Sequence, residues 1–180
     1  MKPQFLLIGL GNPGKQYGDT RHNVGWMAVD NAASKLQARE WNEKPRFLSS
    51  IAEGSLNDIP CLLVKPSTFM NRSGEAVRKL IDFYKLNPAT QMLVCCDDID
   101  LPLGTHRLRM SGGPGTHNGL KSIVDMIGEG FPRLRIGLGS KPEGADLAAW
   151  ILSSMTKDEK SALRPSLEYV TTAMKEVIGT

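Results

Sequence analysis

Residues 5–14 read Phe5-Leu6-Leu7-Ile8-Gly9-Leu10-Gly11-Asn12-Pro13-Gly14, an apolar run that ends in a glycine-rich turn. Four consecutive apolar residues bounded by a turn predict a short, buried strand. Such a strand is typical of a layered α/β domain, in which helices cover the sheet. The rest of the chain follows the same plan, because short apolar runs alternate with segments of helical periodicity.

Further strands are expected where apolar runs recur, and helices where apolar residues repeat at spacings of three and four. The C-terminal segment is also expected to be helical. It begins with the capping-box spacing of Thr156 and Glu159, and Pro165 is expected to kink it or to begin a new helix. Without a repeat or a linker, residues 1–180 are predicted to form a single α/β domain. The expected strands cover residues 61–64, 92–96, 106–110 and 133–138, and the expected helices cover residues 24–36, 73–86 and 116–127.

Composition excludes several classes of protein. No run of about 18 apolar residues is present, so no membrane-spanning helix is predicted. The N-terminus lacks the long apolar stretch and cleavage site of a signal peptide, and a cytoplasmic protein is expected. Cys61, Cys95 and Cys96 lie in apolar runs, which is typical of buried thiols and not of disulfides or zinc sites. The net charge of +3 is too small to identify a nucleic-acid partner by itself.

The glycine-rich turn matches the G-x-G-x-x-G motif of dinucleotide-binding folds, from Gly9 to Gly14. In those folds the third glycine lies in the first turn of a helix that receives a pyrophosphate. Residues 15–23 have no helical periodicity, and the acid expected about 20 residues later would fall in a predicted helix. A nucleotide-dependent enzyme is therefore only a distant alternative, and no cofactor is expected.

Polar residues of kinds common in active sites gather at predicted strand ends and helix starts. Asn12 follows the first strand and Asp97 the third. Ligands of open α/β sheets bind beyond the carboxyl ends of strands, so both residues are expected at a binding crevice. Asn71 and Asn118 also have a structural interpretation, because both lie where helix N-caps are expected. The complete set is Asn12, His22, Asn71, Asp97, His117 and Asn118.

These residue types suit the attack of water on a carbonyl group. The chain has no G-x-S-x-G nucleophile motif, and its cysteines lie in predicted buried strands. A histidine with a carboxylate partner can act as a general base, while carboxamides hold water and a developing oxyanion. The acidic turn over residues 97–100 is an alternative Mg²⁺ site, although no second acidic cluster or phosphate loop accompanies it.

The same polar residues lie inside five longer patterns that follow one another over about residues 5 to 140. The patterns are Gly11-Asn12-Pro13-Gly14-x-x-Tyr17-x-x-Thr20-Arg21-His22-Asn23-x-Gly25, residues 65–74 (Lys-Pro-Ser-Thr-Phe-Met-Asn-Arg-Ser-Gly), Asp97-x-x-Asp100-Leu101-Pro102, residues 112–121, and residues 131–137. In this order they resemble the signatures of the bacterial-type peptidyl-tRNA hydrolase family. Five blocks in order make the resemblance highly specific.

The resemblance implies a single domain with a mixed central β-sheet sandwiched between helices, acting as a monomer without a metal. The implied reaction is hydrolysis of the ester between a peptide and the 3′-terminal ribose of tRNA, with His22 as the base and Asp97 stabilising its productive form. Asn12 would distinguish N-blocked peptidyl-tRNA from aminoacyl-tRNA, whose free α-ammonium would be desolvated without a matching anion. Further substrate contacts are implied for Tyr17, Phe69, Met70, Asn71, His117 and Asn118.

Four arginines suggest where tRNA phosphates bind. Arg107 and Arg109 lie two apart in one predicted strand, and Arg133 and Arg135 in another. Alternation places each pair on one face of its strand, where the guanidinium groups suit phosphates or simply meet solvent. By the resemblance, Arg109 and Arg135 form a clamp on the tRNA 5′-phosphate. The resemblance also extends the expected partners to transient contacts with ribosomal subunits.

The main rival is a protein of the same fold that binds RNA without cleaving it. The presence of His22, Asp97 and the three asparagines favours the enzyme, because RNA binding alone has no need of a base and its carboxylate partner.

Overall fold

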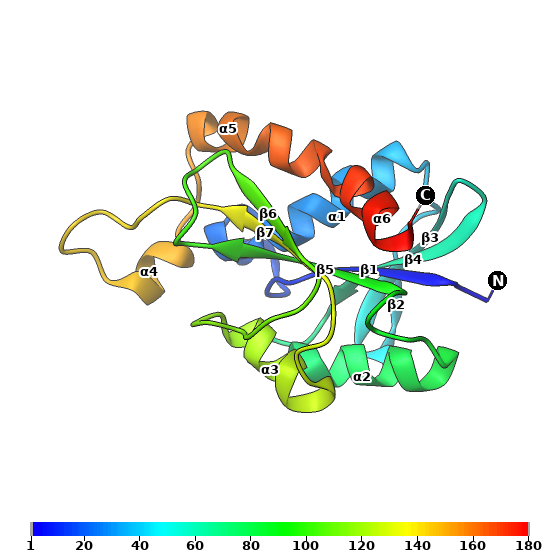
Figure 1. The fold of residues 1–180 in the computed structure, drawn as a ribbon. Helices are drawn as coiled ribbons and strands as arrows, with labels where there is room; N and C mark the ends of the chain where they lie inside the picture. Colours follow the sequence, from blue (N-terminus) through cyan, green and yellow to red (C-terminus); the bar gives the residue numbers. More distant parts are fainter. Residues whose placement is uncertain (1, 180) are drawn as a thin grey trace.

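The computed structural model describes residues 2–179 as a seven-stranded sheet between layers of helices (Figure 1). The strand order is β2-β3-β4-β1-β5-β7-β6. Strands β4, β1, β5 and β7 pair in parallel, whereas the pairs β2–β3, β3–β4 and β6–β7 are antiparallel, so the predicted mixed α/β sheet is confirmed. The strands are β1 (Phe5–Gly9), β2 (Asn42–Lys44), β3 (Ser49–Leu56), β4 (Ile59–Pro66), β5 (Met92–Asp98), β6 (His106–Arg109) and β7 (Arg133–Gly137).

Helices cover both faces of the sheet. Helices α1, α5 and α6 pack on one face, and α2 and α3 on the other, while α4 lies beyond one end of the sheet (Figure 1). No helix within residues 2–179 is long and apolar enough to cross a membrane. The helices are α1 (Val24–Lys35), α2 (Ser73–Tyr84), α3 (Asn118–Ile127), α4 (Leu147–Ile151), α5 (Lys157–Glu168) and α6 (Val170–Ile178), with short 3-10 helices η1 (Lys15–Tyr17), η2 (Arg21–Asn23), η3 (Pro45–Phe47) and η4 (Met70–Arg72).

Strand β1 contributes to both halves of the core. Phe5 and Leu7 join the cluster under α1, whereas Leu6 and Ile8 join the cluster under α2 and α3. All four side chains are at most 1% exposed. Full burial of such a side chain is worth about 1.5–3 kcal/mol, so the apolar run anchors both helix layers to one strand.

The glycines of the G-x-G-x-x-G pattern serve helix–sheet packing. A Cβ atom on Gly9 would lie 2.2 Å from the Gly25 carbonyl oxygen, and one on Gly25 would lie 2.4 Å from the Cys95 carbonyl oxygen. The start of α1 therefore crosses directly over the ends of β1 and β5. After Gly14 the chain forms only η1 and η2 before α1 begins at Val24, so no long helix starts at the position that a pyrophosphate would need.

The sequence prediction missed strands β2 and β3 and helix α4, and it expected the break of the C-terminal helix at Pro165. Strand β3 carries serine, glutamate and glycine among its apolar residues, which hides its period of two, and it forms the edge of the sheet with the short strand β2. Helix α4 is too short to show a helical period. Pro165 lies inside α5 on its exposed side, where the carbonyl group that it leaves unbonded can face water, and the break comes later, at Tyr169.

Helices α2 and α3 meet at Gly74, close to the segments that carry Asn71 and Asn118. The Gly74 amide donates to Ser122 Oγ at 2.9 Å, and a Cβ atom on Gly74 would lie 2.1 Å from the Ser122 carbonyl oxygen. This contact leaves no room for a methyl group. It fixes the two helix starts relative to each other, and the two asparagines with them.

Gly74→Ala is therefore expected to lower the free energy of unfolding by about 1–3 kcal/mol, because the methyl group forces the two helices apart. Helix propensity alone would favour alanine, so the sign of the change in the free energy of unfolding decides between the two effects. Urea unfolding measures this free energy. Gly18→Ala is the matched control, since a Cβ atom there would lie 3.5 Å from its nearest neighbour. Equal stability of the two variants would contradict the close helix contact.

Candidate active site

Three parallel strands end side by side beneath the candidate site. Asn12 follows β1, the segment 69–71 follows β4, and Asp97 is the penultimate residue of β5. Because β4, β1 and β5 are adjacent and parallel, these residues meet at one edge of the sheet. His22 and His117 reach the same place from η2 and from the residue before α3.

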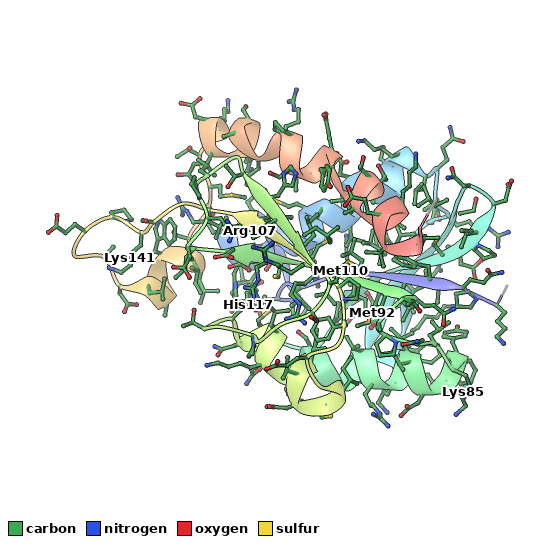
Figure 2. All side chains as sticks on the ribbon, viewed as in Figure 1. Lys85, Met92, Arg107, Met110, His117 and Lys141 are labelled. Atoms are coloured by element: carbon green, nitrogen blue, oxygen red, sulfur yellow. The ribbon has the colours of Figure 1, made fainter. Side chains whose placement is uncertain are left out.

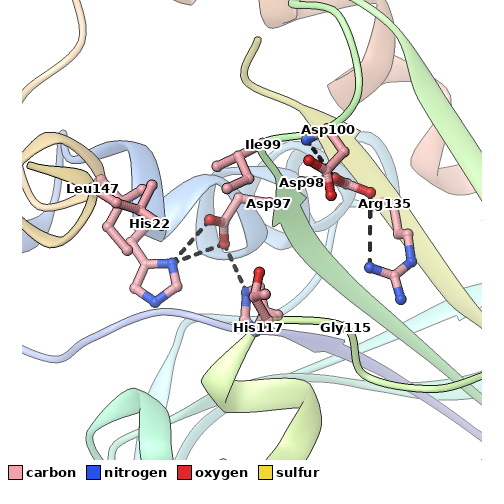
Figure 3. A pocket seen from close by; sticks show the side chains of 11 residues that line it. His22, Asp97, Asp98, Ile99, Asp100, Gly115, His117, Arg135 and Leu147 are labelled. Carbon is pink, nitrogen blue, oxygen red and sulfur yellow. Dashed lines mark hydrogen bonds and ion pairs between the residues drawn. The ribbon is translucent and has the colours of Figure 1, made fainter. Parts of the chain in front are cut away.

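A buried carboxylate joins the two histidines (Figure 3). His22 Nδ1 lies 3.0 and 2.9 Å from the two oxygens of Asp97, and His117 Nε2 lies 2.8 Å from Asp97 Oδ1. Asp97 is 4% exposed, and the two imidazole rings are 5.0 Å apart. The pair that the sequence predicts between His22 and Asp97 is present, with His117 as a second partner of the carboxylate.

The hydrogen bonds assign the protons of both rings. His117 Nδ1 accepts from the Gly119 and Leu120 amides at 3.1 and 3.2 Å, so the His117 proton is on Nε2 and is donated to Asp97. His22 likewise donates from Nδ1 to the carboxylate. This leaves the lone pair on Nε2 of His22, on the opposite side of the ring, and His22 lines the cleft. His117, in contrast, has no free nitrogen for a substrate.

Asp97 stays ionised in this buried position. Burial raises the pKa of Asp97, but the contacts from His117 and His22 outweigh burial and hold the pKa well below its usual range. The neighbouring Cys96 thiol has a raised pKa, chiefly because it is buried, and burial raises the pKa of Cys95 to about 12. These cysteines are core thiols, as predicted, and not nucleophiles.

Asn12 is held in one orientation by a second asparagine. Asn23 Oδ1 accepts from the Asn12 backbone amide and Asn23 Nδ2 donates to the Asn12 carbonyl, each at 2.9 Å. The side-chain Oδ1 of Asn12 accepts from the Met70 amide at 2.9 Å. Because its oxygen is directed to Met70, Asn12 offers its NH₂ group to the cleft. Asn23 is fully buried and was missed as a separate site residue, although it lies within the first family pattern.

The cleft consists of two recesses that meet at His22 and Ile151. The aspartate recess, about 470 Å³, lies beside Asp97, Asp98, Asp100, His117 and Arg135. The asparagine recess, about 600 Å³, lies beside Asn12, Phe69, Met70, Asn71 and Asn118. A base at the junction of two recesses suits hydrolysis of a substrate whose two parts, on either side of the bond that breaks, occupy one recess each.

Asn71 and Asn118 do not act as helix caps. The His117 side chain caps α3, and α2 has no side-chain cap. Both asparagines are exposed in the asparagine recess, and neither carboxamide is hydrogen-bonded to another described residue. Their amide groups are thus available to a ligand.

The aromatic and apolar residues of the predicted set differ in exposure and in distance from the cleft. Phe69 is 57% exposed at the mouth of the asparagine recess, whereas Met70 is buried in its floor. Tyr17 lies in η1, half-buried, and lines neither recess. The substrate contact expected of Tyr17 therefore remains a prediction.

The four arginines adjoin, but they are not equivalent. Arg107 pairs with Arg135 across β6 and β7, and Arg109 pairs with Arg133, so all four lie on one face. Arg133 is fully buried, stacks on Phe131 at 4.0 Å and donates to backbone carbonyls that include Gly112 at 2.6 Å. Arg133 therefore holds the loop, and Arg107, Arg109 and Arg135 are the members of the expected phosphate patch that remain accessible.

His22, Asp97 and His117 are also the group within residues 2–179 whose donor atoms lie close enough together for a metal ion. Each of these donor atoms is already engaged in the hydrogen bonds described above. A metal there would have to displace both histidine–aspartate contacts. Asp98 and Asp100 do not belong to such a group. Instead, Asp98 Oδ1 accepts from the Asp100 amide at 2.8 Å.

An α/β domain whose cleft offers a free imidazole nitrogen, a carboxylate behind it and several amide groups belongs to the class of hydrolytic enzymes. The family described as peptidyl-tRNA hydrolase matches residues 6–180. The chain is 44% identical to the peptidyl-tRNA hydrolase of Chloroflexus aggregans, over 97% of this chain and 93% of the relative. It is 42% identical to that of Alkaliphilus metalliredigens, over 97% and 92%.

The fold agrees with these sequence comparisons. The crystal structure of peptidyl-tRNA hydrolase from Acinetobacter baumannii superposes with a TM-score of 0.90 at 34% identity, covering 99% of this chain and 90% of the other. The chain therefore belongs to the peptidyl-tRNA hydrolase family, as the five sequence patterns predict.

Asp97→Asn is expected to lower kcat by on the order of 10²–10⁴-fold. The new amide would place an NH₂ donor where Asp97 Oδ2 now accepts from His22 Nδ1 at 2.9 Å, which favours the wrong tautomer, and it would remove the charge that stabilises the imidazolium. Steady-state turnover of a peptidyl-tRNA measures the effect. Asp82→Asn is the matched control, since it removes the same charge at an exposed position of α2, paired with Arg78 and outside both recesses. If both variants retain the wild-type kcat, Asp97 does not prepare the base.

Proposed function

We propose that this protein hydrolyses the ester bond between a peptide, or an N-blocked aminoacyl group, and the 3′-terminal ribose of tRNA, with His22 as the general base. One observation carries the proposal. The imidazole of His22 is fixed through Nδ1 by Asp97, which leaves Nε2 as a proton acceptor where the two recesses meet. Family membership supplies the substrate.

In the proposed reaction, His22 Nε2 takes a proton from a water molecule as the water oxygen attacks the ester carbonyl carbon. Asp97 stabilises the imidazolium that forms. The tetrahedral intermediate collapses with loss of the ribose oxygen, which recovers the proton from His22, so that a peptide acid and free tRNA leave. General-base assistance is worth about 10²–10⁴-fold, and one oxyanion donor about 10²–10³-fold.

Asn12 supplies a donor of fixed direction to the bound acyl group. Its oxygen is bonded to the Met70 amide, so its NH₂ group is suited to a carbonyl oxygen of the substrate. A peptide or N-acyl group offers such an oxygen next to the α-carbon, whereas a free α-ammonium would offer only another donor. Selection for N-blocked substrates follows from this mismatch and from the cost of desolvating the ammonium.

We assign the tRNA to the side of the cleft next to strands β6 and β7, which carry Arg109 and Arg135. Arg109 is exposed, and Arg135 lines the aspartate recess, so both can meet a backbone phosphate. Phosphate contacts carry no sequence information, which suits an enzyme that acts on tRNAs of many sequences. The remaining expectations are a monomeric enzyme in the cytoplasm, where tRNA is reused, with transient contacts to ribosomal subunits.

His22→Ala is expected to slow release of the acyl group from N-acetyl-aminoacyl-tRNA by roughly several hundred-fold or more, with EDTA present throughout. His106→Ala is the control, since that histidine stacks on Tyr169 away from the cleft. Binding of the tRNA without release by the wild type would favour the RNA-binding rival.

Arg109→Ala is expected to raise KM by about tenfold while leaving kcat nearly unchanged, because a phosphate contact far from the ester stabilises bound substrate and transition state equally. The effect should shrink as salt is raised and on a tRNA without its 5′-phosphate. Arg39→Ala is the control, an exposed arginine paired with Glu53 outside the cleft. A large fall of kcat at saturating substrate would contradict the assignment.

A further inference from the structure

Helix α4 forms a wall of the cleft but has little packing to hold it. Ile151 lines both recesses, Leu147 lines the aspartate recess, and Leu152, just after the helix, lines the asparagine recess. No residue of α4 is buried. The helix follows an exposed loop that carries Lys141 and extends away from the body of the domain (Figures 1 and 2). Of its residues, Trp150 packs against the core cluster under α1, so apolar packing holds the helix at this point and polar contacts must supply the rest.

Most side-chain contacts at the end of α4 involve Arg21, next to a backbone bridge between Thr20 and Ser154. Its guanidinium lies 4.9 Å from the centre of the Trp150 ring. Its Nη1 donates to Ser153 Oγ at 2.6 Å and reaches the carbonyl oxygens of Trp150, Ser153 and Ser154 at 3.3–3.4 Å. The Arg21 backbone amide also donates to the Ser153 carbonyl at 3.2 Å. The Arg21 side chain thus donates to the carbonyl groups at the end of α4.

Arg21 is itself anchored to the body of the domain. Both carboxylate oxygens of Glu159, in the first turn of α5, lie 2.8 Å from Arg21 Nη2, which donates to them. This explains why the capping box of α5 is only half formed: Thr156 Oγ1 accepts from the Glu159 amide, but the Glu159 carboxylate is directed to Arg21. The Arg21 side chain is 9% exposed and the Glu159 side chain 26%, so the pair is largely shielded from water.

Arg21 directly precedes His22 in η2. A side chain that ties the end of α4 to this segment also sets the distance between Ile151 and the His22 imidazole. We propose that Arg21 is a positioning residue, which holds α4 as the wall of the cleft and thereby fixes how the substrate lies against His22. The inference rests on the proposed function, because its main readout is hydrolysis of peptidyl-tRNA.

Loss of this tether is expected to weaken substrate binding more than chemistry, since the His22–Asp97 pair does not depend on Arg21 contacts. Arg21→Met keeps the apolar stem and removes the donors, and KM should rise about tenfold with kcat changed by less than about threefold. Arg21→Lys should restore only part of the loss, because an ammonium cannot engage the carboxylate and the carbonyls together in the same fork geometry. Glu159→Gln should lie between Arg21→Met and the wild type.

Kinetics on N-acetyl-aminoacyl-tRNA and hydrogen exchange of the peptide spanning residues 147–152 test the proposal. A variant that is merely less stable loses active enzyme, which lowers the apparent kcat and leaves KM unchanged. Faster exchange over residues 147–152 with a raised KM, in Arg21→Met and more weakly in Glu159→Gln, would support the tether. Arg39→Met, which removes an exposed arginine–glutamate pair instead, should change neither.

The proposal is overturned if folded Arg21→Met has the KM and the exchange of the wild type. If Arg21→Met does not fold, Glu159→Gln decides alone, since it keeps the Arg21 side chain: an unchanged KM and exchange would overturn the proposal. These failures are distinct from failure of the proposed function, in which the wild type itself releases no acyl group.

Discussion

The buried carboxylate of Asp97 is the constraint around which the site is built. An ionised group that is 4% exposed is stable only if hydrogen bonds replace its lost hydration, and two imidazole N–H groups supply them. The carboxylate and the two histidines come from three different elements: Asp97 from β5, His22 from η2 before α1, and His117 from the start of α3. The same contacts that make the carboxylate tolerable therefore also draw these elements together and orient His22.

The two histidines have opposite roles because their second nitrogens meet different surroundings. His117 Nδ1 faces the first amides of α3, which can only donate, so this ring is locked as a neutral donor to Asp97. His22 has no such partner for Nε2 and lies where the recesses meet. His117 thus supports the carboxylate with both ring nitrogens engaged, and the substrate contact expected of it remains a prediction, although the sequence places both histidines in similar polar patterns.

The arginines illustrate the same dependence on surroundings. Arg133 and Arg135 are two residues apart on one strand, and both donate to carbonyls of the loop at Gly112 and Gly113, yet Arg133 is enclosed while Arg135 borders the cleft. Arg21 is nearly as buried as Arg133, and it connects the cleft wall to α5 through Glu159. A guanidinium has five donors in a rigid fork, so it can satisfy several carbonyl groups where helices and loops end.

The sequence by itself determined the layered α/β plan, the main strands and helices, and the membership of the polar set. Apolar runs and helical spacing report which residues must be buried, and residues 5–14 carry this signal clearly. Strand β3 was not predicted because its polar residues obscure the alternation of buried and exposed positions. Helix α4 was not predicted because five residues are too few to show a helical spacing. Only the tertiary structure decided that Asn12 turns its NH₂ group to the cleft, that His117 is a donor to Asp97, and that Arg133 is not a phosphate ligand. These outcomes depend on which groups from distant parts of the chain share a hydrogen bond, and residue spacing along the chain holds no record of that.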